Sequence, residues 1–496
     1  MFQRDRAVLR PWTVACGLML TMGAIARAQD TRQVDEPKIP SACVKLEPHL
    51  KGALREQDEE KLDTERIQKA IDGCKPGMAV ELLRGTAASG YFLTGPLEMR
   101  EGVTLLIDKD VTLYGSRDPK VYETPNPDAK PGDPIKCGTS MPRPAAFPVQ
   151  LAATAAARRG GCRPLITIND AKNVGIMGDG TIDGRGYAKI LGKDYSWWQM
   201  ARKAQPTDDL YFNPRLIQAN HADGLVLYRV HLNNSPNFHV GVNNTNGFTA
   251  WGVHLQTPTD KSLDARNTDG IDPGTSQNIT VAYSWIDNGD DNIAIKQGVS
   301  HMSVIHDHFY SGHGMSIGSE TMLGQSYLVV HDLVEDHTSS GIRIKSNVKR
   351  GGPAHDLIYK GVCMKDVPIP IAISPYYTNQ TVEPFEDPKY TGDKIPDYKG
   401  ITLQDIYSET PGDVLIAGLN DEHRTQVMLQ NVTIKGIKPS QVHLFYDDLT
   451  VRSPGTNIPL RESANQTVKL AEDGGKATEP VGDQPDPCAG KFVPMQ

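Results

Sequence analysis

The stretch Ile279-Thr-Val-Ala-Tyr-Ser-Trp-Ile286 decides the fold, because its pattern returns along most of the chain. Two apolar residues flank a third residue, and another apolar residue often follows three positions later. The pattern begins at Val103, Leu225, Phe248, Ile279, Met302, Leu328, Leu357, Ile401 and Val427. From the second of these positions onward, the starts lie 23, 31, 23, 26, 29, 44 and 26 residues apart. A short strand that recurs about every two dozen residues is typical of a solenoid, with loops inserted where the interval is longer.

Two kinds of solenoid have short strands at this spacing, the leucine-rich repeat and the parallel β-helix. The Leu-x-x-Leu-x-Leu-x-x-Asn signature is missing, the corners are rich in Gly, Asn, Ser and Thr, and no long helical pattern lies between the strands. These features predict an all-β protein, a right-handed parallel β-helix of about ten coils. An antiparallel β-sandwich is the alternative, but it would not place chemically matched residues at one phase of the repeat.

One segment, residues 63–73, predicts a helix. Ile67, Ala70, Ile71 and Cys74 form one apolar stripe, with Asp63 as the candidate N-cap. We expect this helix to cap the N-terminal end of the solenoid, because an open end of stacked strands exposes unpaired backbone groups.

The composition fits one large domain with additions at both ends. The chain has 496 residues, of which 38% are apolar, so a wholly disordered protein is excluded. We expect a signal peptide at 1–28, one β-helix domain at 29–461 and a polar, flexible tail at 462–496. Residues 119–161 hold eight prolines and predict a loop excursion from the solenoid.

The first 28 residues have the three parts of a secretory signal. Arg4, Arg6 and Arg10 precede an apolar run, and Ala26-Arg-Ala28 offers a cleavage site. Cleavage would leave 48 basic and 59 acidic residues, a net charge of −11 instead of −8. An acidic protein without a basic tract does not resemble a nucleic-acid-binding protein, and no later apolar run approaches the length of a membrane span. We therefore expect a secreted protein, periplasmic or extracellular, with no nucleic-acid or membrane partner.

An exported protein can form disulfide bonds, and six cysteines follow residue 28. Sequence proximity favours the pairs Cys43–Cys74 and Cys137–Cys162. Cys363 lies in an apolar strand pattern, where a buried free thiol is as good an interpretation as a bond to Cys488. None of the six has Cys-x-x-Cys or Cys/His spacing, so the sequence does not indicate a redox or zinc function.

Six polar residues recur at similar phases of successive repeats. They lie 10 to 15 residues before the next strand start, and they are Asp269, Asp290, Asp291, His313, Arg343 and Lys345. Because neighbouring coils lie about 4.8 Å apart, we expect these side chains to form one cluster on one wall. Carboxylates so close together cannot all ionise readily, so the pKa of at least one should be raised. Each motif alone is also typical of a turn or a solvated strand, but the set in phase indicates a functional site.

Four motifs that carry these residues resemble the signatures of the polygalacturonase family of glycoside hydrolases, family 28. They are Asn267-Thr-Asp-Gly-Ile-Asp272, Gly289-Asp-Asp-Asn-Ile-Ala-Ile-Lys296, Gly312-His-Gly-Met-Ser-Ile-Gly-Ser-Glu320 and Arg343-Ile-Lys-Ser346. Their order and spacing also agree with the family. Stretches outside the motifs, such as Asn213-Pro-Arg-Leu-Ile-Gln218 and Asn234-Ser-Pro-Asn-Phe-His-Val240, are similar to bacterial secreted endopolygalacturonases in particular. The resemblance fades over the proline-rich excursion and in the C-terminal tail.

This resemblance implies an enzyme that hydrolyses α-1,4-galacturonosidic bonds inside polygalacturonate with inversion of configuration. Asp290 would be the general acid, and Asp269 and Asp291 would position and deprotonate the attacking water. His313 would help to hold these acids in the right protonation state. The domain at 29–461 would then be a single catalytic domain.

The resemblance also implies substrate-binding residues. Arg343 and Lys345 would bind the carboxylate of the galacturonate ring beside the cleaved bond. Asn267 would orient the sugar or the Asp269 side chain. Tyr377 would contact the substrate, although the adjacent Tyr376 leaves this register open by one residue.

Other functions stay open from the sequence. An exo-acting polygalacturonase would release sugars from chain ends, a lyase would use calcium, and a non-catalytic solenoid would only bind pectin. A calcium-loop match fails, because Ala265 and Ser276 occupy its first and twelfth ligand positions. His301, His306 and His308 could suggest a metal site, but the last two fit strand alternation. We expect no metal, no cofactor, and a monomer that acts on pectin polysaccharide.

Overall fold

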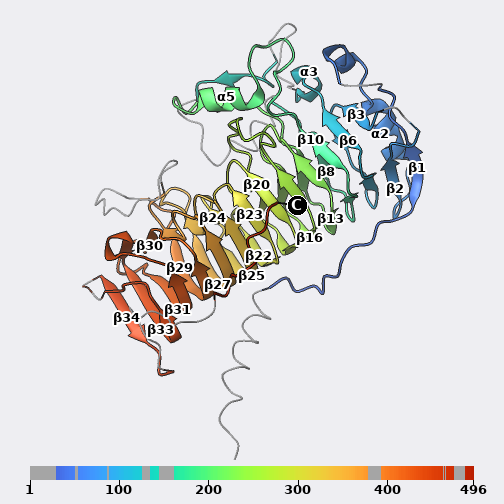
Figure 1. Cartoon of the computed structure of the whole chain (residues 1–496). Helices are drawn as coiled ribbons and strands as arrows, with labels where there is room; N and C mark the ends of the chain where they lie inside the picture. The colour runs from blue at the N-terminus through green and yellow to red at the C-terminus, as the bar shows by residue number, and fades with distance from the viewer. Residues whose placement is uncertain are drawn as a thin grey trace, which may run out of the picture.

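The computed structural model of this chain describes residues 29–50, 54–86, 89–125, 135–143, 161–377, 392–461, 463, 465–473 and 486–495. Its strands stack in parallel along one axis as a right-handed parallel β-helix, which confirms the predicted fold (Figure 1). Three columns of strands form three faces, and apolar side chains fill the interior between them. In the described part of the chain, no helix is long and apolar enough to cross a membrane.

One face is a sheet of eleven parallel strands, which we call the eleven-strand face. Its strands are β4 (Leu97–Glu98), β8 (Ile166–Asn169), β12 (Ile217–Asn220), β15 (Val240–Asn243), β18 (Ile271–Gly274), β21 (Ile293–Ile295), β24 (Met315–Gly318), β26 (Ile342–Lys345), β28 (Ile371–Ser374), β30 (Val414–Ala417) and β32 (Val442–Phe445). Each strand supplies one rung of the stack, which agrees with the prediction of about ten coils.

The second face carries the repeat that the sequence shows. Its strands are β1 (Ala42–Leu46), β2 (Ala79–Leu82), β5 (Thr104–Ile107), β9 (Gly175–Met177), β13 (Leu225–Tyr228), β16 (Asn246–Trp251), β19 (Gln277–Ala282), β22 (Val299–Ile305), β25 (Gln325–Asp336), β27 (Pro353–Lys365), β29 (Asp397–Ser408), β31 (Thr425–Ile434), β33 (Asp447–Thr456) and β34 (Gln466–Leu470). The third face begins with β3 (Tyr91–Thr94), β6 (Thr112–Gly115), β10 (Thr181–Asp183), β14 (His231–Asn233), β17 (His254–Gln256), β20 (Trp285–Asn288) and β23 (His308–Ser311), and the long strands from β25 onward continue it.

The strand starts chosen from the sequence all occupy one register. Leu225 pairs with Phe248, and the pairing continues through each later start to Val427. Val103 has the same phase, because the strand of Gly175 links the two coils. The repeat pattern missed that linking coil, since its strand β9 has only three residues.

The capping helix forms as predicted, as α2 (Thr64–Gly73), with Asp63 at the N-cap and Ile67 and Ile71 fully buried. A second substantial helix, α5 (Trp197–Ala204), was not predicted. It has a capping box: Ser196 Oγ accepts from the backbone N–H of Gln199 at 3.2 Å, and Gln199 Oε1 accepts from the backbone N–H of Ser196 at 2.8 Å. That pattern was readable in the sequence, although the helix is short.

The proline-rich excursion contains small pieces of regular structure. Pro119–Tyr122 forms the helix α3, and Ser140–Met141 forms β7, which pairs antiparallel with β11 (Leu210–Tyr211). Two single-turn 3-10 helices, η1 (Glu56–Glu60) and η3 (Pro439–Gln441), lie elsewhere in the chain.

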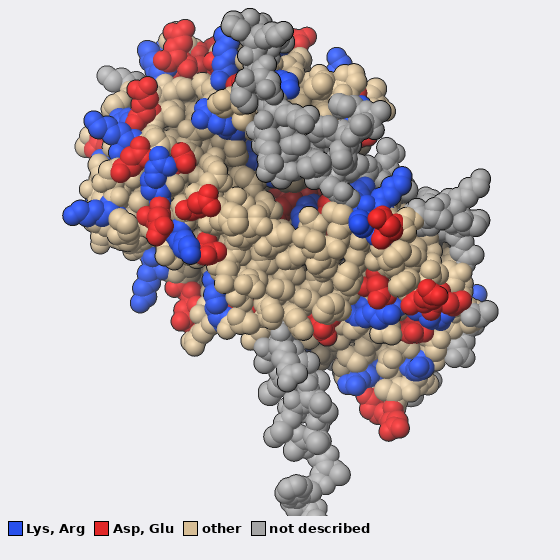
Figure 2. Space-filling model, turned by 180° about the vertical axis from the view of Figure 1, so that it is seen from behind, with Lys and Arg blue, Asp and Glu red and all other residues tan. Residues whose placement is uncertain are grey.

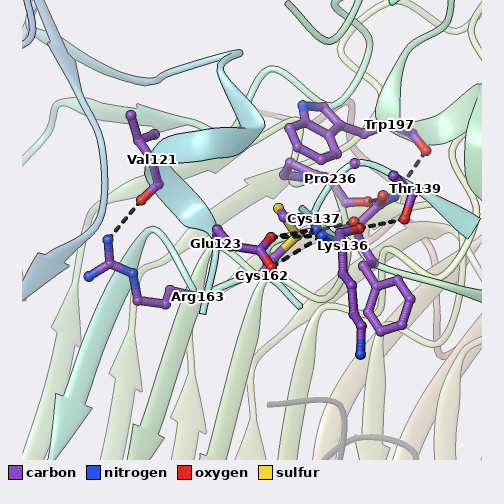
Figure 3. Close-up of a disulfide and its surroundings, with 12 residues drawn as sticks. Val121, Glu123, Lys136, Cys137, Thr139, Cys162, Arg163, Trp197 and Pro236 are labelled. Carbon is purple, nitrogen blue, oxygen red and sulfur yellow. Dashed lines mark hydrogen bonds between the residues drawn. A yellow bond between two sulfur atoms is a disulfide. The ribbon is translucent and has the colours of Figure 1, made fainter. Parts of the chain in front are cut away.

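All six cysteines after residue 28 form disulfides. Cys43–Cys74 and Cys137–Cys162 agree with the favoured pairs, and Cys363 bonds to Cys488 rather than staying a free thiol. Figure 3 shows Glu123 beside the Cys137–Cys162 bond, where its carboxylate accepts from the backbone N–H of Cys137 at 2.8 Å. These contacts fasten the two described ends of the excursion to each other. The predicted signal peptide, residues 1–28, lies outside the described residues.

Two described parts of the expected flexible tail are ordered instead. Gln466–Leu470 forms β34, which extends the second face by pairing with β33. Residues 486–495 return to the middle of the solenoid, where Lys491 pairs with Asp332 at 2.7 Å (Figure 1). The polar composition did not predict either segment, because β34 is held by backbone hydrogen bonds and residues 486–495 are held by a disulfide.

The N-terminal segment is also fastened across the middle of the solenoid. Asp30 is buried, and its carboxylate accepts from Thr280 Oγ1 at 2.8 Å. Arg32 donates to the backbone oxygen of Phe248 at 2.9 Å. Both described ends of the chain therefore lie against coils that are distant in sequence.

Glu335 is a fully buried acid on β25, behind the strand of Met315. Its Oε1 accepts from the backbone N–H of Met315 at 3.2 Å, and its Oε2 has no hydrogen-bond partner among the described residues. Burial raises the pKa of Glu335 to about 8. The folded protein therefore keeps a proton on Glu335 at pH values where the unfolded chain has lost it.

We predict that Glu335 lowers stability as the pH rises from about 4.5 to about 8, because the folded state binds the extra proton over this range. Glu335→Gln should flatten that decline, by up to about 1.4 kcal/mol per pH unit in the free energy of unfolding. Urea denaturation between pH 5 and 8.5 measures it, with the exposed Glu422→Gln as the control. Parallel curves for the wild type and Glu335→Gln would contradict the prediction.

Candidate active site

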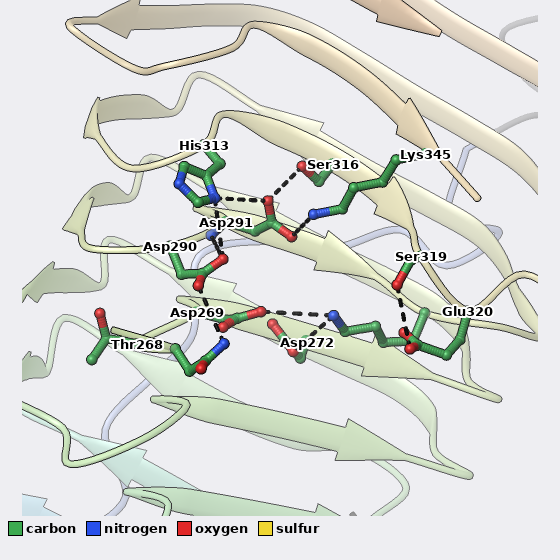
Figure 4. Close-up of polar contacts among 12 residues, drawn as sticks. Thr268, Asp269, Asp272, Asp290, Asp291, His313, Ser316, Ser319, Glu320 and Lys345 are labelled. Atoms are coloured by element: carbon green, nitrogen blue, oxygen red, sulfur yellow. Dashed lines mark hydrogen bonds and ion pairs between the residues drawn. The ribbon is translucent and has the colours of Figure 1, made fainter. Parts of the chain in front are cut away.

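The register of the eleven-strand face brings the acids and the histidine together. Asp269, Asp291 and His313 each stand two positions before the first residue of β18, β21 and β24. Backbone hydrogen bonds from Gly270 N–H to Asp291 O, at 2.9 Å, and from Asn292 N–H to Gly314 O, at 3.2 Å, hold the three coils in phase. The three side chains therefore stack in adjacent coils on the outside of the face, with Asp290 beside them (Figure 4).

Asp291 is the centre of the charge network. Its carboxylate accepts from Lys345 Nζ at 2.7 Å, from Arg343 at 3.0 Å and from Ser316 Oγ at 2.8 Å. Its side chain is only 2% exposed. Burial opposes its ionisation, but Lys345, Arg343 and His313 outweigh burial and lower the pKa of Asp291. Asp291 is therefore a carboxylate.

Asp290 is the most exposed of the three aspartates, at 18% of its side chain. His313 Nδ1 lies 3.2 Å from Asp290 Oδ1 and 3.7 Å from Asp291 Oδ1. Burial opposes the ionisation of Asp290, but the hydrogen bond and charge of His313 and the charge of Lys345 lower its pKa. Asp290 thus faces the outside of the cluster with an imidazole against it.

Asp269 has the opposite balance. Burial, the charge of Asp290 and the charge of Asp272 raise the pKa of Asp269 well above its ordinary value. Lys296 Nζ lies 3.7 Å from Asp269 and 3.5 Å from Asp272, so it offsets this effect only partly. The expected raised pKa therefore occurs at Asp269 and not at Asp290, because His313 lies against Asp290 alone of these two.

Asp272 and Lys296 were not singled out from the sequence. Asp272 is buried and Lys296 is half-buried on the eleven-strand face. Burial raises the pKa of Asp272 to about 6, although the charge of Lys296 opposes this effect. The signal was present, because both belong to quoted motifs and Lys296 directly follows β21 as Lys345 ends β26. Lys296 and Lys345 each follow a paired isoleucine, Ile295 and Ile344, so alignment of the strands of this face would have identified Lys296.

The predicted binding residues also reach the cluster. Asn267 donates to Asp290 Oδ2 at 3.3 Å and accepts from the hydroxyl of Tyr211 at 2.6 Å. The ring of Tyr377 lies 5.7 Å from the guanidinium of Arg343 and 5.3 Å from Lys345 Nζ. Tyr211 was missed, because nothing in its local sequence relates it to Asn267.

The adjacent Tyr376 is buried and points elsewhere. It is 4% exposed, and its hydroxyl donates to the backbone oxygen of Leu419 at 2.8 Å. Tyr377 is therefore the tyrosine that lies beside the charged cluster. Arg350, whose guanidinium lies 5.9 Å from the same ring, joins this side of the cluster.

Ligand atoms of Asp290, Asp291 and His313 come within 4.8 Å of one another, a spacing that could hold a metal ion. Two cations already contact the Asp291 carboxylate, so the charge of a metal there would be opposed. The residues present fit a proton-transfer site better than a metal site.

Figure 2 shows acidic and basic atoms at the base of a hollow in the middle of the molecule.

Comparisons with known proteins find relatives over most of this chain. The family model described as "Glycosyl hydrolases family 28" matches residues 133–446. An endo-polygalacturonase of Pectobacterium carotovorum subsp. carotovorum is 39% identical over 87% of this chain and 96% of its own length. A polygalacturonase of Ralstonia solanacearum is 33% identical over 82% of this chain and 81% of its own length.

A solved structure gives the same result in three dimensions. The polygalacturonase from Erwinia carotovora ssp. carotovora superposes with a TM-score of 0.69 at 38% identity, over 84% of this chain and all of that one. The family model covers more than half of this chain and includes every residue of the cluster. The chain belongs to family 28 of the glycosyl hydrolases.

Proposed function

We propose that this glycoside hydrolase is an endo-acting polygalacturonase, which cleaves α-1,4 bonds inside de-esterified pectin with inversion of configuration. The observation that carries the proposal is the cluster of three aspartates and one histidine with Arg343 and Lys345 beside them, on a chain 39% identical to an endo-polygalacturonase. Acids cleave the glycosidic bond, and cations attract a substrate that carries one carboxylate on each sugar.

Asp290 is the proposed general acid, because it is the most exposed of the three aspartates and can reach the leaving oxygen. It must hold a proton when the substrate arrives. One proton shared by His313 and Asp290 can sit on either group. On His313 it gives an ion pair, and on Asp290 it gives two neutral groups. Substrate that excludes water from this contact favours the neutral pair, since separated charges are costly without solvent.

Asp291 and Asp269 are the proposed pair on the water side. Asp291 is ionised and can take a proton from the attacking water, while the raised pKa of Asp269 lets it donate a hydrogen bond to that water. The water oxygen bonds to the anomeric carbon as the bond to the leaving oxygen breaks, and Asp290 gives its proton to that oxygen. Attack from the face opposite the leaving group inverts the configuration.

Arg343, Lys345 and Tyr377 are the proposed contacts for the sugar on one side of the cleaved bond. The buried Nε of Arg343 has no hydrogen-bond partner among the described residues, while another N–H of its guanidinium donates to Asp291 at 3.0 Å. Asn267, fixed by Tyr211 and Asp290, would orient the sugar. Strands β4 to β15 and β28 to β32 extend the face beyond the acids in both directions, which supports cleavage within a chain.

We also infer that the protein works outside the cytoplasm, as a monomer on the polysaccharide. Its three disulfides favour an oxidising compartment. The predicted signal at 1–28 would deliver it there.

We predict that Asp290→Asn lowers kcat by about 10²–10⁴-fold, because the amide cannot donate the proton that the leaving oxygen needs. The melting temperature should stay the same or rise, since one charge leaves a crowded acidic cluster. Proton NMR of the wild-type reaction should show the β anomer first. The exposed Asp393→Asn is the matched control. An α anomer at first turnover would contradict the inverting mechanism, and near-normal activity of Asp290→Asn would contradict its assigned role.

We predict that Lys345→Met moves the acidic limb of the kcat profile to higher pH by about 1–3 units, because loss of an opposite charge raises the pKa of Asp291. A base with a lowered pKa works down to low pH, and a base with a raised pKa loses activity sooner as the pH falls. Steady-state kinetics from pH 3 to 8 measure the shift. Lys394→Met, which removes a lysine whose side chain is 43% exposed, is the control. An unmoved acidic limb would show that Asp291 ionisation does not limit the reaction.

We predict that the viscosity of polygalacturonate falls much faster than reducing ends appear, because internal cuts shorten the polymer most. Both are measured in one reaction, with and without excess chelator. Release of only mono- or digalacturonate would indicate an exo-acting enzyme instead. Loss of activity with chelator would favour a calcium-dependent lyase, and no activity in either condition would favour a pectin-binding protein.

A further inference from the structure

Arg215 is a half-buried cation that the proposed mechanism does not use. It stands two positions before β12, as Asp269 stands two positions before β18. Backbone hydrogen bonds from Leu216 N–H to Phe238 O, at 3.0 Å, and from His239 N–H to Asp269 O, at 2.9 Å, keep these coils in phase. Arg215 therefore lies two coils from Asp269, roughly 10 Å along the solenoid axis.

This position is on the side of the acids opposite to Arg343. Arg343 belongs to β26, which follows the strands of the acids, whereas Arg215 precedes them. A polysaccharide that lies along the axis would pass over both arginines, with the cleaved bond between them. The eleven-strand face thus carries cations on both flanks of its acidic centre.

The guanidinium of Arg215 is held in place but has no anionic partner among the described residues. It lies 4.6 Å from the centroid of the Phe238 ring, which is half-buried, and one of its N–H groups donates to Gln218 Oε1. Within the described ranges it forms no ion pair with an aspartate or glutamate. A guanidinium has five N–H donors, so most of the donors of Arg215 have no hydrogen-bond partner in the part of the chain that the structure describes.

An arginine held in this way is suited to a carboxylate. Stacking on an aromatic ring and a hydrogen bond fix the planar fork, which reduces the entropy lost when a ligand binds. A partly desolvated cation without a counter-charge is costly, and an anionic ligand would remove that cost. Asp269 and Asp272 contribute attraction to Arg215 at longer range, but neither makes a direct contact with it.

We propose that Arg215, stacked on Phe238, binds the carboxylate of a galacturonate unit on the flank of the acids opposite to Arg343 and Lys345, and so makes the enzyme select de-esterified pectin on both sides of the cleaved bond. The inference rests on the proposed polygalacturonase function and adds a specificity-determining residue to it. A methyl ester at that unit would lose the charge-assisted pair, because the ester carries no negative charge.

Arg215→Gln tests this inference with two substrates, polygalacturonate and the same polymer after extensive methyl esterification. On polygalacturonate, kcat/KM should fall about 10- to 100-fold, mainly through a higher KM, because one charged hydrogen-bonding partner is lost. The preference for the free acid over the ester should shrink in the variant. Arg229→Gln, which removes an arginine paired with Asp179 elsewhere on the molecule, is the matched control and should behave as the wild type.

The outcomes separate this inference from the function on which it rests. A wild type that does not cut polygalacturonate overturns both. A wild type that cuts it while folded Arg215→Gln keeps the same KM and the same ester preference overturns the role of Arg215 alone. If Arg215→Gln does not fold, Arg215→Lys decides, because it keeps the charge but not the bidentate fork. A KM raised several-fold on polygalacturonate then supports the inference, and an unchanged KM overturns it.

Discussion

The register of backbone hydrogen bonds between successive coils is the constraint on which the rest of this structure depends. Each coil must align with the next, so a residue at one phase of the repeat meets the residue at the same phase one coil away. The interior uses this rule to stack apolar side chains. The outside of the eleven-strand face uses it to stack Asp269, Asp291 and His313, which stand 22 residues apart in three successive coils.

The same rule concentrates negative charge, and the site is stable because cations occupy neighbouring rungs. Lys296 forms ion pairs with Asp269 and Asp272, whereas Lys345 and Arg343 form ion pairs with Asp291. The division is uneven, since Asp291 has two close partners and Asp269 shares one distant partner. Unequal compensation makes three similar carboxylates differ in proton affinity, and such a difference is what a pair of acid and base groups needs.

Most of the fold could be predicted from the sequence, because the aligned coils of a β-helix produce a repeating pattern of apolar residues. The strand starts from Leu225 to Val427 proved to be aligned, and α2 began after Asp63 as predicted. The coil through Gly175 and the helix α5 were missed, since a short strand and a short helix leave weak patterns. Within the site, phase grouped the six charged residues, but it could not assign the raised pKa to Asp269, which depends on the placement of His313.

The two fastened ends change how this solenoid can come apart. A stack of repeats ordinarily frays from its termini, because each outer coil has a neighbour on one side only. Here Cys488 is bonded to Cys363 on β27, and Asp30 is buried against β19. The last coils thus belong to a covalently closed loop of 125 residues in sequence separation, so losing their strand pairing does not set the chain end free. Opening of the described coils should therefore begin elsewhere than at these two fastened segments.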